Sequence, residues 1–277
     1  MPSCNQSQST REFITLAAFL MATTALAIDM MLPAMGMMSD DLGLTQPHRI
    51  SWVILGIFTG LVFGQLLFGP LSDAIGRRTS IQIGIGIFLI GTLICALANS
   101  FEILIAGRIL QGFGGSATRI VTQAMVRDRF AGREMARIMS FVMTIFIMVP
   151  VFAPMVGQAV LWFGSWHTLF LTLGGFSAII LLWFTIRQPE TLIERRSITR
   201  EHLLSAFLTV IKNQKTMRFT VAAGISFGGL VSYLSSAQHI FQDIYHTGEW
   251  FPVLFGSTAA SIAISSMVNA RYVRQLE

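Results

Sequence analysis

The 277-residue chain is 53% hydrophobic and only 12% charged, and its formal net charge is +5 at pH 7. A water-soluble domain needs far more charge to cover its surface, so the composition predicts an integral membrane protein. The two cysteines, Cys4 and Cys95, cannot form a disulfide framework and lack the spacing of a metal site, so we expect neither a metal nor a cofactor.

Eight apolar stretches are long enough to cross a membrane, because about 20 helical residues span the roughly 30 Å hydrocarbon core. They cover residues 14–37, 51–72, 79–98, 102–126, 137–163, 166–187, 217–238 and 250–269. We therefore expect an all-α integral membrane fold. The first stretch is too long for a cleaved signal peptide and should remain in the mature protein.

The basic residues gather in alternate connections between these stretches. Assigning alternate connections to one side places all 19 lysines and arginines there except Arg49, Arg108 and Arg119. The positive-inside rule then puts both termini in the cytoplasm. The excess of positive charge is therefore explained by the orientation of the chain in the membrane. For this reason we do not expect a nucleic-acid partner.

The first stretch contains an acidic residue, Asp29, whose insertion into a membrane costs about 2.5 to 3.5 kcal/mol. Residues 18, 22, 25, 29 and 33 share one helix face and are three alanines, Asp29 and a proline. Such a small-residue stripe lets a neighbour approach or leaves room for a cavity, so Asp29 should face the bundle interior. Two roles stay open for it: a site that exchanges a proton or cation, or a structural acid held by hydrogen bonds.

The connection between the second and third stretches reads Gly69-Pro-Leu-Ser-Asp-Ala-Ile-Gly-Arg-Arg78. It resembles the loop signature of the major facilitator superfamily, G-x-L-x-D-x-x-G-R-R/K. An aspartate here can meet a helix N-terminus or an arginine, and a glycine permits a tight turn. The resemblance implies a conformational gate on the cytoplasmic side that is formed by Gly69, Asp73, Gly76, Arg77 and Arg78.

The fourth stretch carries Arg108 and Arg119, three helical turns apart, with Gly112, Gly115 and Gln123 on the same face. Guanidinium groups stay charged, so they need carboxylates, carbonyl dipoles or water, which a shared aqueous cavity would supply most simply. The alternative is that an arginine, above all Arg119, extends toward the membrane interface.

The glycines of this stretch follow no strand and lack the dinucleotide-binding spacing, so they favour close helix packing over nucleotide binding. The candidates for cavity or packing roles are Gln111, Gly112, Gly115 and Arg119.

In the fifth stretch, Pro150, Pro154 and Gly157 interrupt helical hydrogen bonding and predict a kink or hinge. As plain structure, such a kink needs no ligand.

Residues 188–216 form one long charged connection, with a short helix possible near residues 200–212. It separates six stretches from two, which suits transporters built from repeated halves. We predict an N-terminal six-helix bundle at 1–187, a cytoplasmic linker at 188–216, and a partial C-terminal bundle of two helices at 217–277.

Three further segments resemble the drug/proton antiporter branch of the superfamily: Ile28-Asp-Met-Met-Leu-Pro33, Arg108-Ile-Leu-Gln-Gly112 and Ala153-Pro-Met-Val-Gly157. With Val126-Arg-Asp128 and Asn269-Ala-Arg-Tyr-Val-Arg274, they indicate the bicyclomycin-resistance (Bcr/CflA) subfamily. The resemblance implies a monomeric exporter of small hydrophobic or amphipathic drugs in the bacterial inner membrane, driven by proton entry. Asp29 would be its proton site and Arg108 the coupling partner.

The chain departs from this family in several places. Ala153 and Gln158 stand where the family has glycines, and Arg119 is unusual. The family folds as twelve helices, so we expect a chain that lacks the last four.

Two alternatives to drug export stay open. The chain could transport a defined metabolite such as a sugar or amino acid, or it could be a non-transporting truncated membrane protein. No H-E-x-x-H, G-x-S-x-G or paired-aspartate motif occurs in the stretches, so we do not expect an enzyme.

Overall fold

The computed structural model describes residues 8–192, 194–195, 208–209 and 211–276, and this part of the chain holds helices and turns but no strand. The long helices are α1 (Thr10–Asp29), α3 (Trp52–Ile75), α4 (Arg77–Ala96), α5 (Phe101–Arg129), α6 (Gly132–Leu161), α7 (Trp166–Arg187), α9 (Gln214–Gln238) and α10 (Phe251–Leu276). Short helical turns are η1 (Leu32–Ala34), α2 (Met35–Asp41), η2 (Pro47–Ser51), η3 (His239–Ile244) and η4 (Gly248–Trp250). The predicted all-helical fold is confirmed, and each predicted stretch overlaps one long helix.

By length and composition, six of the described segments could cross a membrane, and they contain α1, α3, α4, α6, α7 and α9. The helices α5 and α10 are not among these six. For α5 the reason lies in its sequence, which contains two interior arginines, two glutamines and several glycines. This helix is therefore the most polar of the predicted stretches. Its contacts with neighbouring helices show how its polar side chains are held inside the bundle.

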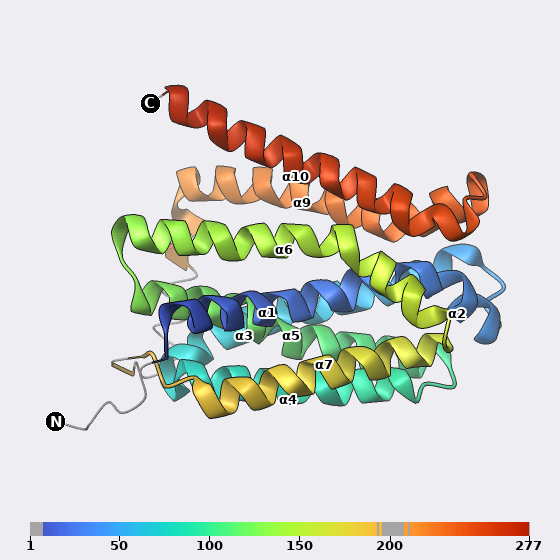
Figure 1. Ribbon diagram of the computed structural model, residues 1–277, viewed down its shortest axis with the longest axis horizontal. Coiled ribbons are helices and arrows are strands. Elements are labelled where there is room, and N and C mark those ends of the chain that lie inside the picture. Colours follow the sequence, from blue (N-terminus) through green and yellow to red (C-terminus); the bar gives the residue numbers. More distant parts are fainter. Residues whose placement is uncertain (1–7, 193, 196–207, 210, 277) are drawn as a thin grey trace.

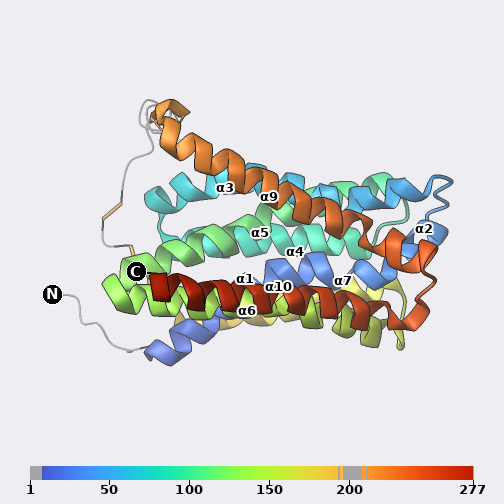
Figure 2. The same cartoon turned by 90° about the horizontal axis from the view of Figure 1, so that it is seen from above.

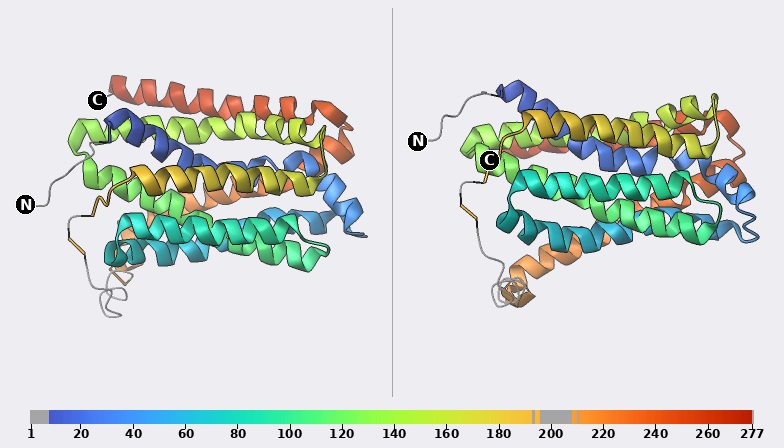
Figure 3. Two further views of the ribbon diagram at one scale, coloured as in Figure 1. Left: turned by 60° about the horizontal axis from the view of Figure 1, so that its bottom comes forward. Right: turned by 90° about the horizontal axis from the view of Figure 1, so that it is seen from below.

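The helix α5 packs most extensively against α3 and α4. A Cβ atom added to Gly60 of α3 would collide with the backbone carbonyl of Ile109, and one added to Gly112 of α5 would collide with that of Ile57. Glycine at these points lets the two backbones touch, as is usual between membrane helices. Figure 3 shows α4, in turquoise, beside both α5 and α7.

The remaining helices surround this group. The helix α1 packs against α5, α6 and α7, while α10 runs along α6 and α9 meets α3 (Figures 1 and 2). The start of α1 and the end of α10 lie at the same end of the bundle. Buried apolar side chains form two clusters, one that includes Trp166 and Phe255 and another that includes Phe13 and Phe184.

The first predicted stretch differs from the structure, because α1 ends at Asp29 and does not continue to residue 37. Pro33 has no N–H to donate to the carbonyl four residues earlier, and its ring would clash with that carbonyl, which belongs to Asp29. The chain instead passes through η1, which has Pro33 near its start, into α2. Asp29 is therefore the last residue of a broken helix.

The division into residues 1–187, 188–216 and 217–277 stays a prediction. The short helix that we predicted near residues 200–212 falls largely outside the described residues.

Candidate functional site

A cavity lies between α1, α3, α5, α6, α9 and α10, and two of its lining residues, Asp29 and Arg119, carry charge. The rest of its wall on α1, α3 and α6 consists of Ala25, Ile28, Phe58, Phe146 and Pro150. The wall is thus apolar and aromatic, with one acidic and one basic side chain. Such a combination of apolar surface with few polar groups is typical of small-molecule sites.

The opposite wall comes from the last two described helices. It consists of Phe227, Leu230, Tyr233, Leu234, Phe255 and Ala259. The Tyr233 and Phe255 rings are stacked, with their centroids 5.8 Å apart and an angle of 8° between their planes. The Tyr233 hydroxyl also forms a 2.6 Å hydrogen bond with Thr258 Oγ1. These contacts join α9 to α10 beside the cavity.

Asp29 is buried, with 3% of its surface exposed, which agrees with its expected place in the bundle interior. Its Oδ1 atom has no hydrogen-bond partner within the described part of the chain. The fixed hydrogen bonds that a purely structural acid needs are therefore not found around this oxygen.

Arg108 is completely buried, and backbone carbonyls surround it. Its Nε donates to the Val53 carbonyl at 3.0 Å, and its Nη1 donates to the Ala27 carbonyl at 2.9 Å and to Gln111 Oε1 at 2.6 Å. Gln111 in turn donates to Thr92 Oγ1 at 2.8 Å. Arg108 and Gln111 thus connect α5 to α1, α3 and α4, and Arg108 does not extend to an interface.

Arg119 lies in different surroundings, so the two arginines do not share a cavity. Its guanidinium carbon is 5.4 Å from the ring centroid of Phe146 and 5.9 Å from that of Phe227. The ion pairs found among the described residues do not include Arg119. The structure therefore brings Arg119, and not Arg108, to the cavity that Asp29 lines. Within the described residues, no hydrogen bond or ion pair joins Asp29 to either arginine.

The predicted hinge residues connect α6 to the same place. Pro150 and Pro154 lie inside α6, which changes direction partway along its length (Figure 1). Pro150 lines the cavity, and a Cβ added to Gly157 would collide with the carbonyl of Met30. The helix α6 therefore touches the chain directly after Asp29. A change in the bend of α6 would displace the residues next to Asp29.

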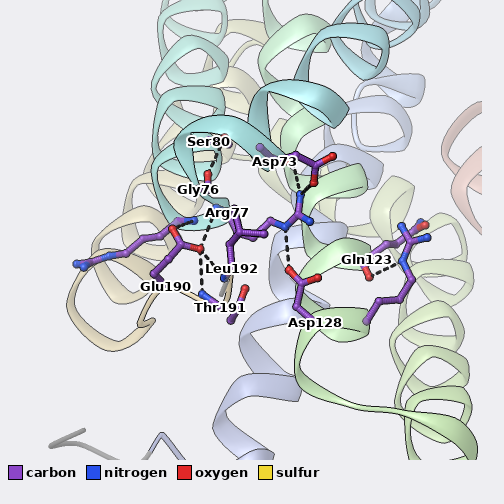
Figure 4. A network of polar contacts seen from close by, with 12 residues as sticks. Asp73, Gly76, Arg77, Ser80, Gln123, Asp128, Glu190, Thr191 and Leu192 are labelled. Carbon is purple, nitrogen blue, oxygen red and sulfur yellow. Dashed lines mark hydrogen bonds and ion pairs between the residues drawn. The ribbon is translucent and has the colours of Figure 1, made fainter. Parts of the chain in front are cut away.

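The predicted gate residues form a charged network at the loop between α3 and α4 (Figure 4). Arg77 pairs with Asp73 at 2.6 Å and with Asp128, at the end of α5, at 2.8 Å. Gly69, Asp73 and Arg77 line one hollow together with Asp128. Gly76 has a φ of +102°, a backbone conformation that favours glycine. The aspartate–arginine contact and the glycine turn agree with the physical account of the signature.

Sequence reasoning missed Glu190, which follows α7. The backbone N–H groups of Arg77 and Arg78 donate to its two carboxylate oxygens at 2.9 and 3.1 Å (Figure 4). Glu190 therefore caps the first turn of α4, where a negative charge is favoured. Arg78 also donates from Nη2 to the Thr185 carbonyl at 2.6 Å. The only signal in the sequence was an acidic residue in a mostly basic connection, which does not reveal a partner 113 residues away.

Comparison with known proteins supports the sequence resemblance. The sequence profile of the Major Facilitator Superfamily matches residues 17–277. An uncharacterized MFS-type transporter, YdgK, from Bacillus subtilis is 33% identical over 92% of this chain and 65% of its own length. A bicyclomycin resistance protein homolog from Haemophilus influenzae is 28% identical over 98% of this chain and 69% of its own length. The chain thus spans about two thirds of the length of these relatives.

A solved structure shows the same fold. The crystal structure of a D-xylose-proton symporter superposes with a TM-score of 0.68 at 14% identity, covering 95% of this chain and 68% of that one. The loop signature, the helix order and the profile match over nearly the whole sequence agree with one another. The chain belongs to the Major Facilitator Superfamily, and its similarity to a bicyclomycin resistance protein homolog agrees with the subfamily resemblance that its motifs predict.

Proposed function

We propose that this chain acts in proton-coupled drug export, with Asp29 as the proton site and the adjoining cavity as the drug site. The observation that carries the proposal is the unpaired Asp29 carboxyl oxygen beside an aromatic cavity. Family membership places the chain in a lipid bilayer among multi-pass transport proteins, which are not enzymes. A relative that is named for resistance to bicyclomycin supports drugs as the cargo.

The exchange follows from competition at one site. A charged Asp29 attracts hydrogen-bond donors of a drug, whereas a protonated Asp29 is neutral and holds such a drug less well. Proton entry through about 100 mV supplies roughly 2.3 kcal/mol, and each pH unit adds about 1.4 kcal/mol. This energy can support an appreciable drug gradient when the site opens alternately to the two sides of the membrane.

Arg108 is the proposed coupling partner of Asp29. It holds the carbonyl of Ala27, two residues before Asp29, while its Nη2 has no partner among the described residues. A negative charge on Asp29 would attract this arginine, and protonation would remove that attraction. The position of the α1 end relative to α3 and α5 would then depend on the protonation of Asp29.

The proline-containing part of α6 and the loop network are the proposed moving parts. Gly157 links α6 to the end of α1, so the bend at Pro150 and Pro154 can respond to the state of Asp29. The pairs of Arg77 with Asp73 and Asp128 would hold one conformation and separate in the other.

We further propose that the chain acts as a monomer with both termini in the cytoplasm. The concentration of basic residues in alternate connections supports this orientation. The common position of the α1 start and the α10 end at one end of the bundle supports termini on the same side. A sugar is a poorer cargo than a drug here, because the described cavity wall is mostly apolar and a sugar needs many hydrogen-bonding side chains.

The test uses inside-out membrane vesicles that contain the chain, with an imposed pH gradient that is acidic inside. We expect bicyclomycin to accumulate in these vesicles until a protonophore collapses the gradient. Asp29→Asn should abolish this accumulation, and Asp29→Glu, which keeps a carboxyl group, should retain part of it. Equal accumulation by the wild-type chain and the Asp29→Asn variant would remove Asp29 from the mechanism. Absence of accumulation by the wild-type chain would contradict export.

A further inference from the structure

Arg119 is a permanent positive charge in the wall of the cavity, and the proton coupling proposed above gives it no role. Arginine stays charged in proteins, so its effect on the cavity persists whatever the protonation of Asp29. Arg108, by contrast, already donates three hydrogen bonds to protein acceptors. No hydrogen bond from Arg119 is found within the described residues, and its donors are therefore available to a molecule in the cavity.

The aromatic rings around Arg119 add a second argument. Rings such as Phe146 and Phe227 could attract a lipophilic cation through their electron-rich faces. In this structure the guanidinium of Arg119 already lies near both rings, at 5.4 and 5.9 Å from their centroids. A cationic drug would have to displace this contact and would meet a like charge as well.

We propose that Arg119 determines the charge specificity of the cavity, so that it accepts uncharged aromatic compounds with hydrogen-bond acceptors and binds an organic anion more tightly than an organic cation of the same shape. This inference rests on the proposed drug site. With Asp29 protonated, the two charged residues of the described wall sum to one positive charge, and with Asp29 ionised they sum to zero. The pair never provides the net negative charge that would favour a cation.

The test compares two ions of nearly the same size and shape, tetraphenylphosphonium and tetraphenylborate, which differ in the sign of their charge. Their binding to the purified chain in a neutral detergent is measured, and the cation-to-anion affinity ratio is compared between variants. Charges a few ångströms apart change an equilibrium constant by more than tenfold near a protein surface. Arg119→Gln should therefore raise this ratio at least about tenfold.

Two further variants make the test selective. Asp29→Asn removes the opposite charge from the same wall and should lower the ratio, while Arg119→Lys keeps the positive charge and should leave the ratio near the wild-type value. Arg49→Gln is the matched control, because Arg49 also lies over a ring, at 5.0 Å from the Phe101 centroid, but does not line this cavity. It removes the same charge from the chain and should not change the ratio.

The possible results separate the two proposals. If both ions bind and Arg119→Gln changes the ratio no more than Arg49→Gln does, charge selection by Arg119 is wrong while the drug site stands. If Arg119→Gln is not folded, an altered ratio in Arg119→Lys would overturn the inference equally, because that variant keeps the charge. If neither ion binds the wild-type chain, the charge preference assigned to Arg119 is wrong, and the drug site is then judged by the bicyclomycin accumulation experiment alone.

Discussion

Arg108 and Arg119 belong to the same helix, α5, yet the regions around them are built in opposite ways. Around Arg108, glycines bring the helix backbones into contact, and the arginine donates to carbonyls of α1 and α3. Around Arg119, aromatic side chains from neighbouring helices line a cavity. Arg108 thus connects neighbouring helices of the bundle, whereas Arg119, three helical turns further along α5, is available to a ligand.

The difference teaches how a membrane protein accommodates a polar helix. Where no cavity exists, a buried arginine needs protein acceptors, and Arg108 finds them for Nε and Nη1 in two backbone carbonyls and a glutamine side chain. Where a cavity exists, the faces of aromatic rings can stabilise the positive charge, and its donors can point into the cavity. We infer that the Arg108 region contributes stability and the Arg119 region contributes recognition, and the following substitutions separate these contributions.

The largest expected effect on stability is that of Arg108→Met. It removes the charged donor that binds the carbonyls of Val53 and Ala27 and the Gln111 side chain, and each hydrogen bond to a charged group contributes about 1.5 to 3 kcal/mol. We expect the free energy of unfolding to fall by about 4 kcal/mol in total. Unfolding in detergent mixtures with increasing sodium dodecyl sulfate, followed by circular dichroism, measures this change.

The control for that substitution is Arg119→Met. Because Arg119 makes no hydrogen bond among the described residues, the same exchange should change the free energy of unfolding by less than about 1 kcal/mol. Equal losses in the two variants would show that the two regions do not differ as the structure indicates.

The next largest effect concerns the glycine contacts. Gly112→Ala forces a Cβ atom against the Ile57 carbonyl, and a backbone cannot move aside as a flexible side chain can. We expect a loss of about 3 kcal/mol, at the upper end of the usual cost of overpacking. The same unfolding experiment measures it.

Gly224→Ala in α9 is the matched control, because nothing lies within 4 Å of the position that its Cβ would take. Alanine favours a helix over glycine, so this variant should be unchanged or more stable by up to about 1 kcal/mol. A destabilising Gly224→Ala or a neutral Gly112→Ala would contradict the packing described for α3 and α5.

Much of this fold could be predicted because membrane helices need long apolar stretches. All eight predicted stretches overlap long helices, and the glycines of the fourth stretch do lie at close helix contacts. The break after Asp29 was not predicted, although Pro33 was visible four residues later. The apolar run through residues 30–37 hid it, since hydropathy does not register a missing backbone donor.

The surroundings of the two arginines could not be predicted from the same sequence. They share a helix face, but eleven residues separate them by about 16 Å along the helix axis. At that spacing they meet different neighbours, and which helices those are depends on the packing of the whole bundle. A shared cavity was the simplest expectation from α5 alone, and only the positions of α1, α3, α6 and α9 show two separate surroundings.

The smallest expected effect tests the loop end of the bundle, which sequence reasoning described incompletely. Glu190→Gln keeps the shape of the side chain but removes the charge that accepts from the first N–H groups of α4. We expect a loss of about 1 kcal/mol, similar to that of a helix cap. The difference should shrink in high salt, because Glu190 is exposed and ions screen its interaction with the helix terminus. Glu194→Gln, an exposed acidic residue of the same connection, should have no effect. If both substitutions cost the same, general charge balance and not the cap on α4 explains the role of Glu190.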